Sequence, residues 1–272
     1  MLDQKVIPFR QPLVDWNKAM KESGFQKENE LHHMYRLKRY FSPQIAEIVL
    51  KRPDGDSLWE SHRQEVTVVV LDLRGFTKFA NSAEPEDVMA LLRNYHTEMG
   101  RLVFEFQGTL ERFTGDGMMV FFNAPIPCEQ HTKKAVMMAL EMRDRAKELR
   151  GAWLKQGYDL DLGIGLTAGY ASVGNFGFEG RMDYGAVGKV TNLTYRLCAE
   201  ASGGQILTNQ TTLNKVEGFV HAEPVARLPL KGFPHPISTF NIVGTKLSLQ
   251  IPIDKKSSSH PVSKSSHPSV IL

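Results

Sequence analysis

Two stretches of the chain are apolar almost without interruption. Residues 66–71 read VTVVVL, and residues 117–122 read GMMVFF. A strand with one solvent-exposed face alternates apolar and polar positions, whereas a strand covered on both faces is apolar nearly throughout. The pattern therefore predicts two central strands, 66–72 and 117–122, in the middle of a sheet.

Between and after these strands, apolar residues recur every three or four positions, which is the spacing of one helix face. This spacing predicts helices over about 85–106 and 130–150, and further strands are expected at 109–113 and 160–169. The residues that define the two helix faces are Val88, Leu91, Leu92, Tyr95, Met99, Leu102 and Val103 in the first, and Ala135, Met138, Ala139, Met142 and Ala146 in the second.

The order of these elements predicts the fold class. Strand, helix, hairpin, helix, strand is the split βαβ arrangement of a ferredoxin-like core. It is followed by a glycine-rich segment, 172–188, which we expect to be a flexible excursion, by a helix over 189–201 and by several short strands up to residue 243. We therefore expect an α+β protein with a ferredoxin-like βαββαβ core and additional C-terminal strands and helix.

The segments on either side of this core differ from it in composition. Residues 1–61 are expected to form a helical lead-in, in which the Ser-Pro pair at 42–43 separates two short helices, because Ser caps a helix and Pro fits its first turn. The second of these helices is expected to end near Lys51. Residues 247–272 are rich in Ser, Pro, Lys and His and contain too little apolar surface to order themselves, so we expect a flexible tail. One domain, 62–246, remains between them.

Composition and charge argue against some classes of protein. With 272 residues, of which 42% are apolar and 23% charged, the chain can bury a full core. Its net charge of only +3, from charges interspersed along the sequence, argues against a nucleic-acid partner. No apolar run approaches the roughly 20 residues that cross a bilayer, and no signal-peptide pattern opens the chain, so we expect a cytoplasmic protein with no membrane span. Cys128 and Cys198 could form one disulfide, but their spacing does not suggest metal ligation.

Two aspartates stand where the buried strands come to the surface. Asp72 ends the first strand, and Asp116 lies in the turn just before the second. A pair of acids on neighbouring strands, followed in one case by a Gly-Phe-Thr turn with free backbone N–H groups, suits a Mg²⁺ ion and a phosphate. This pattern indicates phosphoryl or nucleotidyl chemistry.

Four separated motifs extend this indication. They are VVLDLRGFT at 69–77, RFTGDGMMVFF at 112–122, DYGAVGKVTNLTYRL at 183–197 and LKG at 230–232. With them, the chain resembles the class III nucleotidyl cyclase catalytic domain of bacterial type, the adenylate and guanylate cyclase family, over about 62–245. The resemblance implies the class III cyclase fold and a homodimer whose active sites are composed from both chains.

The resemblance also implies a metal site. Asp72 and Asp116 match the family's two metal-binding aspartates, and Leu73 matches a residue whose backbone carbonyl is a further ligand. The expected cofactors are two Mg²⁺ or Mn²⁺ ions. One lowers the pKa of the attacking ribose hydroxyl and the other neutralises the triphosphate, so no side-chain base is required.

Substrate contacts follow from the same matches. The turn Gly75, Phe76 and Thr77 would offer backbone N–H groups to the phosphates. Lys231 matches a triphosphate-binding lysine.

Two further matches lie in the segment 183–197. Asn192 and Arg196 are four residues apart on a predicted helix and therefore share one face. They match the family's transition-state Asn and Arg, so Asn192 would orient the ribose and Arg196 would meet the charge that develops on the α-phosphate.

The sequence departs from the family pattern where the base is chosen. Cyclases that use ATP usually carry Lys and an Asp or Thr at the positions of Arg112 and Gly185, and guanylate cyclases often carry Glu and Cys. Arg112 can only donate hydrogen bonds, and Gly185 offers no side chain. Because Arg112 keeps the donor of the lysine it replaces, ATP is the expected substrate, with GTP or a pyrimidine nucleotide as alternatives.

Two neighbouring positions bear on substrate binding. Glu111 could accept a hydrogen bond from the base, but strand alternation points it away from Arg112 unless a bulge intervenes. Tyr170 stands where many relatives carry an arginine, so one triphosphate contact is expected to be missing or supplied elsewhere. A regulatory nucleotide-binding domain with weak catalysis is therefore a second hypothesis.

A third hypothesis is another enzyme with the same core, such as a diguanylate cyclase or a polymerase-type nucleotidyltransferase, since fold alone does not fix function. The hairpin at 109–122 lacks a GG[DE]EF-like motif, and the pair Asn192 and Arg196 argues against both.

Overall fold

A computed structural model describes residues 36, 38–51, 60–178 and 181–246. The predicted tail, 247–272, and most of the first lead-in helix lie outside these residues. The elements are η1 (Lys38–Tyr40), α2 (Pro43–Lys51), β1 (His62–Arg74), α4 (Phe76–Ala80), α5 (Pro85–Glu105), β2 (Thr109–Thr114), β3 (Gly117–Phe122), α6 (His131–Lys155), β4 (Asp161–Phe178), β5 (Arg181–Val187), α7 (Lys189–Glu200), β6 (Ile206–Asn209), α8 (Gln210–Val216), β7 (Val220–Leu228) and β8 (Ile237–Thr245).

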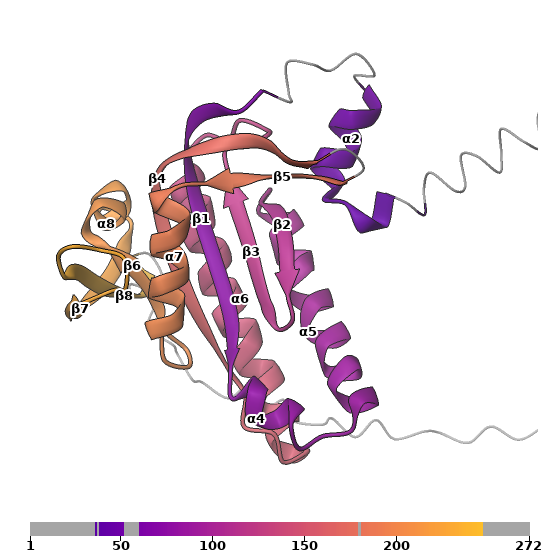
Figure 1. Ribbon diagram of the computed structural model, residues 1–272. Coiled ribbons are helices and arrows are strands. Elements are labelled where there is room, and N and C mark those ends of the chain that lie inside the picture. The colour runs from indigo at the N-terminus through magenta and orange to yellow at the C-terminus, as the bar shows by residue number, and fades with distance from the viewer. Residues whose placement is uncertain (1–35, 37, 52–59, 179–180, 247–272) are drawn as a thin grey trace, which may run out of the picture.

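One sheet joins all the strands of the described part of the chain. Its order is β2-β3-β1-β4-β6-β8-β7, and β5 pairs with β4 outside this row. The strands β2, β3, β1 and β4 pair with one another in antiparallel fashion, with β1 between β3 and β4, which is the strand order of a ferredoxin-like core. The predicted α+β class and βαββαβ core are confirmed, and the additional C-terminal elements are β5 to β8 with α7 and α8 (Figure 1).

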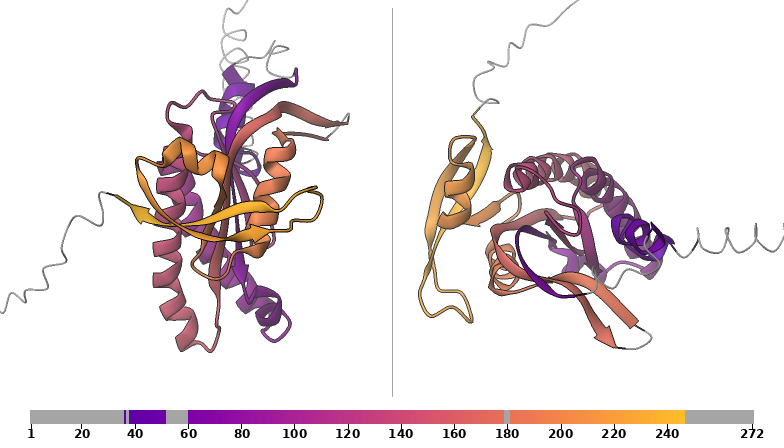
Figure 2. Two further views of the ribbon diagram at one scale, coloured as in Figure 1. Left: turned by 90° about the vertical axis from the view of Figure 1, so that its left-hand side faces the viewer. Right: turned by 90° about the horizontal axis from the view of Figure 1, so that it is seen from above.

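Strand β1 is buried on both faces over Val66–Leu71, as its almost wholly apolar pattern predicts. Val69 and Leu71 belong to the core that α5 and α6 cover, whereas Val66, Val68 and Val70 belong to the core beneath α7. In Figures 1 and 2, α5 and α6 accordingly lie on one face of the sheet and α7 on the other. The central strand is therefore fixed between two apolar layers, and its end is a rigid place for a functional side chain.

The prediction of a flexible glycine-rich excursion at 172–188 is wrong. β4 runs to Phe178, and it pairs with β5 in an antiparallel hairpin that extends past the sheet toward α2 (Figure 1). Its glycines allow close backbone approach: a Cβ at Gly177, where φ is +143°, would lie 2.2 Å from the carbonyl oxygen of Arg181. Glycine here serves a tightly paired hairpin, although the same residues in a sequence indicate irregular structure.

The second lead-in helix is confirmed as α2, which begins at Pro43 and ends at Lys51. Its Gln44 donates from Nε2 to the carbonyl oxygen of Gly108 at 2.8 Å, which ties the helix to the residue before β2. Helix α2 thus packs on the domain close to the β2–β3 hairpin.

Both cysteines, Cys128 and Cys198, are free and buried, so the disulfide considered above is not formed. Burial raises the pKa of the Cys198 thiol to about 12. Among the described residues, no helix has the length and apolar character needed to cross a membrane.

Candidate active site

The two aspartates come together at one end of the sheet. Asp72 lies near the end of β1, and Asp116 lies in the two-residue turn between β2 and β3. Because β3 pairs with β1, the turn stands beside Asp72, and the backbone N–H of Leu73 donates to Oδ2 of Asp116 at 3.0 Å. Strand pairing, predicted from two apolar runs 45 residues apart, thus brings two carboxylates to one place.

This arrangement has an electrostatic cost. Burial and the nearby charge of Asp72 raise the pKa of Asp116 to about 6. Arg74 relieves part of the repulsion, because its Nη2 lies 3.4 Å from Oδ2 of Asp72. Two carboxylates held side by side, with one guanidinium at the edge, favour a further positive charge between them.

The donor set suits a hard divalent cation, whose preferred ligands are oxygens. Within the described ranges, no group of three or more His, Cys, Asp or Glu side chains is placed to hold a metal. Two carboxylates alone do not complete the shell of such an ion, so backbone carbonyls, water and phosphate oxygens of a substrate would supply the other ligands. The residues therefore fit an ion that is held jointly with a phosphorylated ligand.

Replacing Asp116 with Asn is expected to stabilise the metal-free protein at neutral pH. The folded-state pKa of about 6 lies above the ordinary 3.8, so the ionised carboxylate destabilises the fold above pH 6, and this penalty disappears as the pH falls toward 4. Because the group is half exposed, the gain is on the order of 1 kcal/mol.

Thermal unfolding of metal-free protein at pH 7.5 and pH 4 measures this gain. The Asp116→Asn variant should melt above the wild type at the higher pH only, while Asp144→Asn, an exposed acid on α6, should shift neither midpoint. Equal midpoints for wild type and Asp116→Asn at both values would show that the two carboxylates do not repel each other.

A glycine turn follows the first aspartate. Gly75 has φ +85°, and a Cβ at this position would lie 2.6 Å from the carbonyl oxygen of Asp159, so the turn requires glycine. Gly75 caps α4, which places the backbone N–H groups of Phe76 and Thr77 in the first turn of that helix. N–H groups in a first turn have no partner within the helix, so they are available to an anion beside Asp72.

Helix α7 carries the predicted Asn192 and Arg196. Both side chains are exposed on one face of the helix, and neither has a hydrogen-bond or ion-pair partner in the parts of the chain that the structure describes. Likewise, no described contact joins either of them to Asp72 or Asp116. A single chain therefore brings the two acids together but leaves this Asn–Arg pair apart from them.

Lys231 lies between β7 and β8, and its side chain is exposed. The preceding residue, Leu230, is buried in a cluster with Leu193 and Leu197 of α7. The lysine is therefore anchored beside α7, the helix that carries Asn192.

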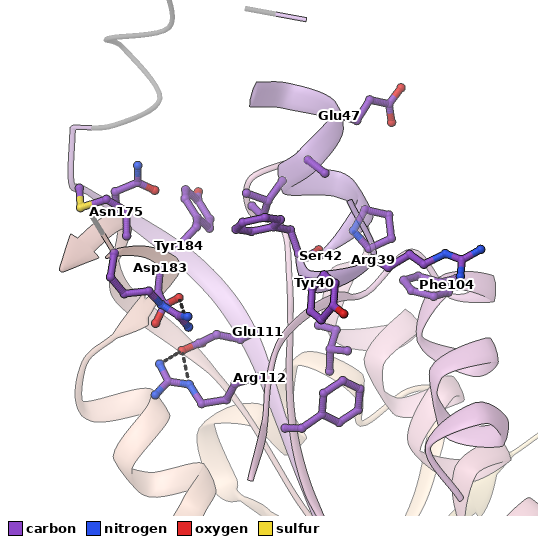
Figure 3. Close-up of a pocket in the computed structure, with 18 residues that line it drawn as sticks. Arg39, Tyr40, Ser42, Glu47, Phe104, Glu111, Arg112, Asn175, Asp183 and Tyr184 are labelled. Carbon is purple, nitrogen blue, oxygen red and sulfur yellow. Dashed lines mark hydrogen bonds and ion pairs between the residues drawn. The ribbon is translucent and has the colours of Figure 1, made fainter. Parts of the chain in front are cut away.

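The residues predicted to recognise the base lie close together, and a β-bulge in β2 determines how their side chains are arranged. The register of β2 against β3 shifts between Leu110 and Arg112, so Glu111 does not follow the alternation expected for a regular strand. Its carboxylate forms an ion pair with Arg112 (Figure 3), and the Glu111 side chain is 4% exposed, whereas the Arg112 side chain is 45% exposed. Burial raises the pKa of Glu111, and Arg112 opposes this shift.

Gly185 stands on the other side of this carboxylate. A Cβ at Gly185 would lie 2.7 Å from Oε1 of Glu111, so the two positions compete for one space. Glu111 and Arg112 line a cleft of about 1270 Å³ between α2, β2 and the β4–β5 hairpin (Figure 3). The bulge, which a single sequence does not signal, thus brings an acceptor to the place where Gly185 has none.

Tyr170 is 57% exposed, and the guanidinium of Arg63 lies 4.5 Å from the centre of its ring. Arg63 of β1 therefore brings a guanidinium beside position 170, where the sequence has a tyrosine. Sequence reasoning missed Arg63, because its proximity depends on the pairing of β1 with β4.

The ferredoxin-like sheet, the paired carboxylates at its end and the helix with Asn192 and Arg196 define a nucleotidyl cyclase domain of class III. Residues 59–244 match the model of the adenylate and guanylate cyclase catalytic domain, so the chain belongs to this family.

The proteins that this chain resembles include some named adenylate cyclase and some named guanylyl cyclase. Adenylate cyclase 1 of Rhizobium meliloti (strain 1021) is 28% identical over 193 residues, which cover 70% of this chain and 29% of that protein. The crystal structure of the adenylyl cyclase CyaB from P. aeruginosa is 34% identical, with a TM-score of 0.66, and the match covers 68% of this chain and 96% of that one. The guanylyl cyclase Cya2 is also 34% identical, with a TM-score of 0.63 over 68% of this chain and 94% of that one. The chain spans less than a third of the length of the curated relative.

Proposed function

We propose that this protein is a metal-dependent nucleotidyl cyclase that converts ATP to 3′,5′-cyclic AMP and pyrophosphate, and that it acts as a homodimer in second-messenger signalling. The observation that carries the proposal is the pair Asp72 and Asp116, held together by strand pairing and by the Leu73 N–H. A folded protein keeps two adjacent carboxylates of this kind where a cation and its ligand supply the missing charge.

In the proposed reaction, the ribose 3′-oxygen forms a bond to the α-phosphorus while the bond from that phosphorus to the pyrophosphate oxygen breaks, and the hydroxyl proton passes to solvent. Asp72, Asp116 and the carbonyl of Leu73 would hold two Mg²⁺ or Mn²⁺ ions. When bound, such ions lower the pKa of the hydroxyl and neutralise the triphosphate. The backbone N–H groups of the Gly75 turn would bind phosphate oxygens.

A second copy of the chain would complete each site. Its Asn192 would orient the ribose, its Arg196 would bind the α-phosphate oxygens through a planar fork of donors, and its Lys231 would bind the triphosphate. This assignment is supported by the exposure of Asn192 and Arg196 and by the lack of any described contact between them and the aspartates of their own chain.

An exposed apolar surface supports a second copy as the partner. The β4–β5 hairpin extends beyond the sheet, and several of its large apolar side chains are exposed to solvent. Apolar side chains gathered on one projecting element are typical of an interface with another protein surface. The residues are Phe176, Phe178, Met182 and Val187.

The substrate is tested by incubating purified protein with Mg²⁺ or Mn²⁺ and each of ATP, GTP, CTP and UTP, and by identifying the products by mass spectrometry. We expect cyclic AMP from the wild type and no product from Asp116→Ala. Cyclic GMP as the main product would assign a guanylate cyclase instead. If all four nucleotides bind but none is converted, a regulatory nucleotide-binding domain becomes the better description.

A further inference from the structure

We propose that Arg74 is a positioning residue: it fixes the C-terminal half of helix α7, and with it Arg196, to the strand end that carries Asp72. This role rests on the proposed function and deepens it, because it names the contact through which a chain holds in place the helix that it lends to its partner's site. The guanidinium, the glycines of β4 and the anchoring of α7 each support it.

The guanidinium of Arg74 lies between the end of β1 and α7. Its Nη2 donates to the carbonyl oxygen of Cys198 at 2.9 Å and lies 3.6 Å from the Sγ of the same residue. The same nitrogen is 3.4 Å from Oδ2 of Asp72. Cys198 is in the last turn of α7, where carbonyl groups lack helical partners and a positive charge suits the helix dipole. The helix therefore holds the guanidinium more closely than Asp72 does, and the carboxylate stays available to a cation.

Two glycines of β4 make room for this arrangement. A Cβ at Gly163, the residue that pairs with Asp72, would lie 2.5 Å from Nε of Arg74. A Cβ at Gly165 would lie 2.3 Å from the carbonyl oxygen of Thr194. The arginine and the backbone of α7 thus both lie directly on β4, at positions where any side chain would exclude them.

The first half of α7 has its own anchor on the sheet. Oγ1 of Thr167, on β4, donates to the carbonyl oxygen of Val190 at 3.1 Å and lies 2.5 Å from Oγ1 of Thr194. All three residues are buried, so these bonds are shielded from water. The position of this half of the helix is therefore independent of Arg74.

The second half of α7, which carries Arg196, depends on weaker contacts apart from that of Arg74. Tyr195 donates to Sδ of Met119 at 3.4 Å, and Sγ of Cys198 donates to a β4 carbonyl at 3.5 Å. Sulfur is a weak donor and a weak acceptor, whereas a bond from a guanidinium is strengthened by its charge. Arg196 lies two residues before Cys198, so the bond from Arg74 is the strongest of these contacts and acts close to Arg196.

A small shift of this half of the helix would matter for turnover. Misplacing a group that binds the reacting phosphate by about 1 Å can cost on the order of a hundredfold in rate. In the proposed dimer, Arg196 serves the partner's site, whereas Asp72 serves the other site. Loss of Arg74 should therefore impair a site to which the neighbouring Asp72 does not belong.

Mixed dimers can locate the effect of Arg74 on one side of a single intact site. A dimer of an Asp72→Asn chain and an Arg196→Ala chain has one intact site, which takes its aspartates from the Arg196→Ala chain and its α7 from the Asp72→Asn chain. Arg74→Met is added to either chain in turn. Cyclic nucleotide formation is then measured over a range of ATP and Mn²⁺ concentrations, with formation of the mixed dimers demonstrated separately.

The two placements of Arg74→Met have different expected results. On the chain that lends α7, kcat should fall by about tenfold to a hundredfold at an unchanged Mn²⁺ dependence, because Arg196 is misplaced. On the chain that lends the aspartates, kcat should change little, and half-maximal activity should need less Mn²⁺, because a guanidinium beside Asp72 repels the ion. Equal losses of kcat in both placements, or a loss confined to the chain that lends the aspartates, would overturn the inference.

Arg74→Lys separates the charge from the bond to the helix, and it replaces Arg74→Met if that variant does not fold. Lysine keeps a positive charge near Asp72, but its side chain is shorter and ends in one nitrogen instead of a planar fork. On the chain that lends α7, it should lower kcat as Arg74→Met does, and in neither placement should it change the Mn²⁺ dependence. Full kcat for Arg74→Lys on the chain that lends α7 would contradict a role for the bond to Cys198.

Amide hydrogen exchange tests the positioning role without turnover. In unmixed Arg74→Met protein, exchange should be faster than in the wild type over 194–200 and unchanged over the first half of α7. Arg101→Met, which removes an exposed ion pair with Glu105 on α5, is the matched control and should change neither. If exchange responds in this way but no nucleotide is cyclised, the proposed function fails and the positioning role stands. If cyclic AMP forms and exchange in Arg74→Met matches the wild type, the reverse holds.

Discussion

The Asp116→Asn variant is expected to lose at least about a thousandfold in kcat with either metal, while its fold is retained or slightly stabilised. Asparagine has nearly the shape of aspartate and can still accept from the Leu73 N–H, so the turn between β2 and β3 should keep its conformation. The variant lacks the charge that a divalent cation requires. Asp72→Asn is expected to lose activity similarly, because each metal ligand would serve the same site.

The diagnostic result is the combination of lost turnover with an unchanged or raised melting temperature. Mn²⁺ with a non-reactive ATP analogue should raise the melting temperature of the wild type and should have little effect on either variant. The exposed-acid variant Asp144→Asn serves as the matched control in both assays. An Asp116→Asn protein that turns over ATP at near the wild-type rate would exclude the proposed role, and one that is inactive because it unfolds would point to a structural role.

The central part of the fold was predictable because its pattern is simple. A short, almost wholly apolar run rich in β-branched residues, such as 66–71, indicates a strand covered on both faces, and the helix spacing of α5 and α6 supplies one of the covering layers. The strand 117–122 has the predicted bounds. Once these strands are neighbours, the proximity of Asp72 and Asp116 follows.

The β4–β5 hairpin was not predictable in the same way. Glycine at positions such as Gly174 and Gly177 weakens the strand signal, because glycine has no side chain that indicates a face. In the folded chain, glycine is required at these positions because other backbone comes close: Ser61 lies against Gly174, and Arg181 lies against Gly177. A sequence pattern does not show either of these contacts. Tertiary contacts here override local preference.

The residues around Arg112 show that sequence patterns also have this limit at the level of single residues. The sequence identifies Arg112 and Gly185 as unusual, and it names Glu111 as an acceptor only on the condition of a bulge. The bulge occurs, and it changes which side chains meet. A shift of one residue in register has no signature in composition, so the pairing of Glu111 with Gly185 required the structure.

Mixing two inactive variants is expected to restore activity, if the sites are shared between chains. Asp72→Asn chains lack the metal site but keep Arg196, and Arg196→Ala chains have the opposite defect. In a heterodimer, one composite site receives both defects and the other receives neither. With free exchange of equal amounts, half of the dimers are mixed and each has one intact site of two, so about a quarter of wild-type activity should return.

The measurement is cyclic nucleotide formation as a function of the mixing ratio, at a fixed total protein concentration. Activity should be near zero for each pure variant and highest at equal amounts. The matched control mixes Asp72→Asn with Asp116→Asn: these two residues lie together within one chain, so every site in the mixed dimer keeps one defect and no activity should return. No recovery in the test mixture, when mixed dimers are demonstrated, would place Arg196 and the aspartates in the same chain's site. Recovery in the control would mean instead that the two aspartates of one site come from different chains. The contrast between the two mixtures follows from the observation that one chain joins the two aspartates but leaves Arg196 on α7 without a described partner.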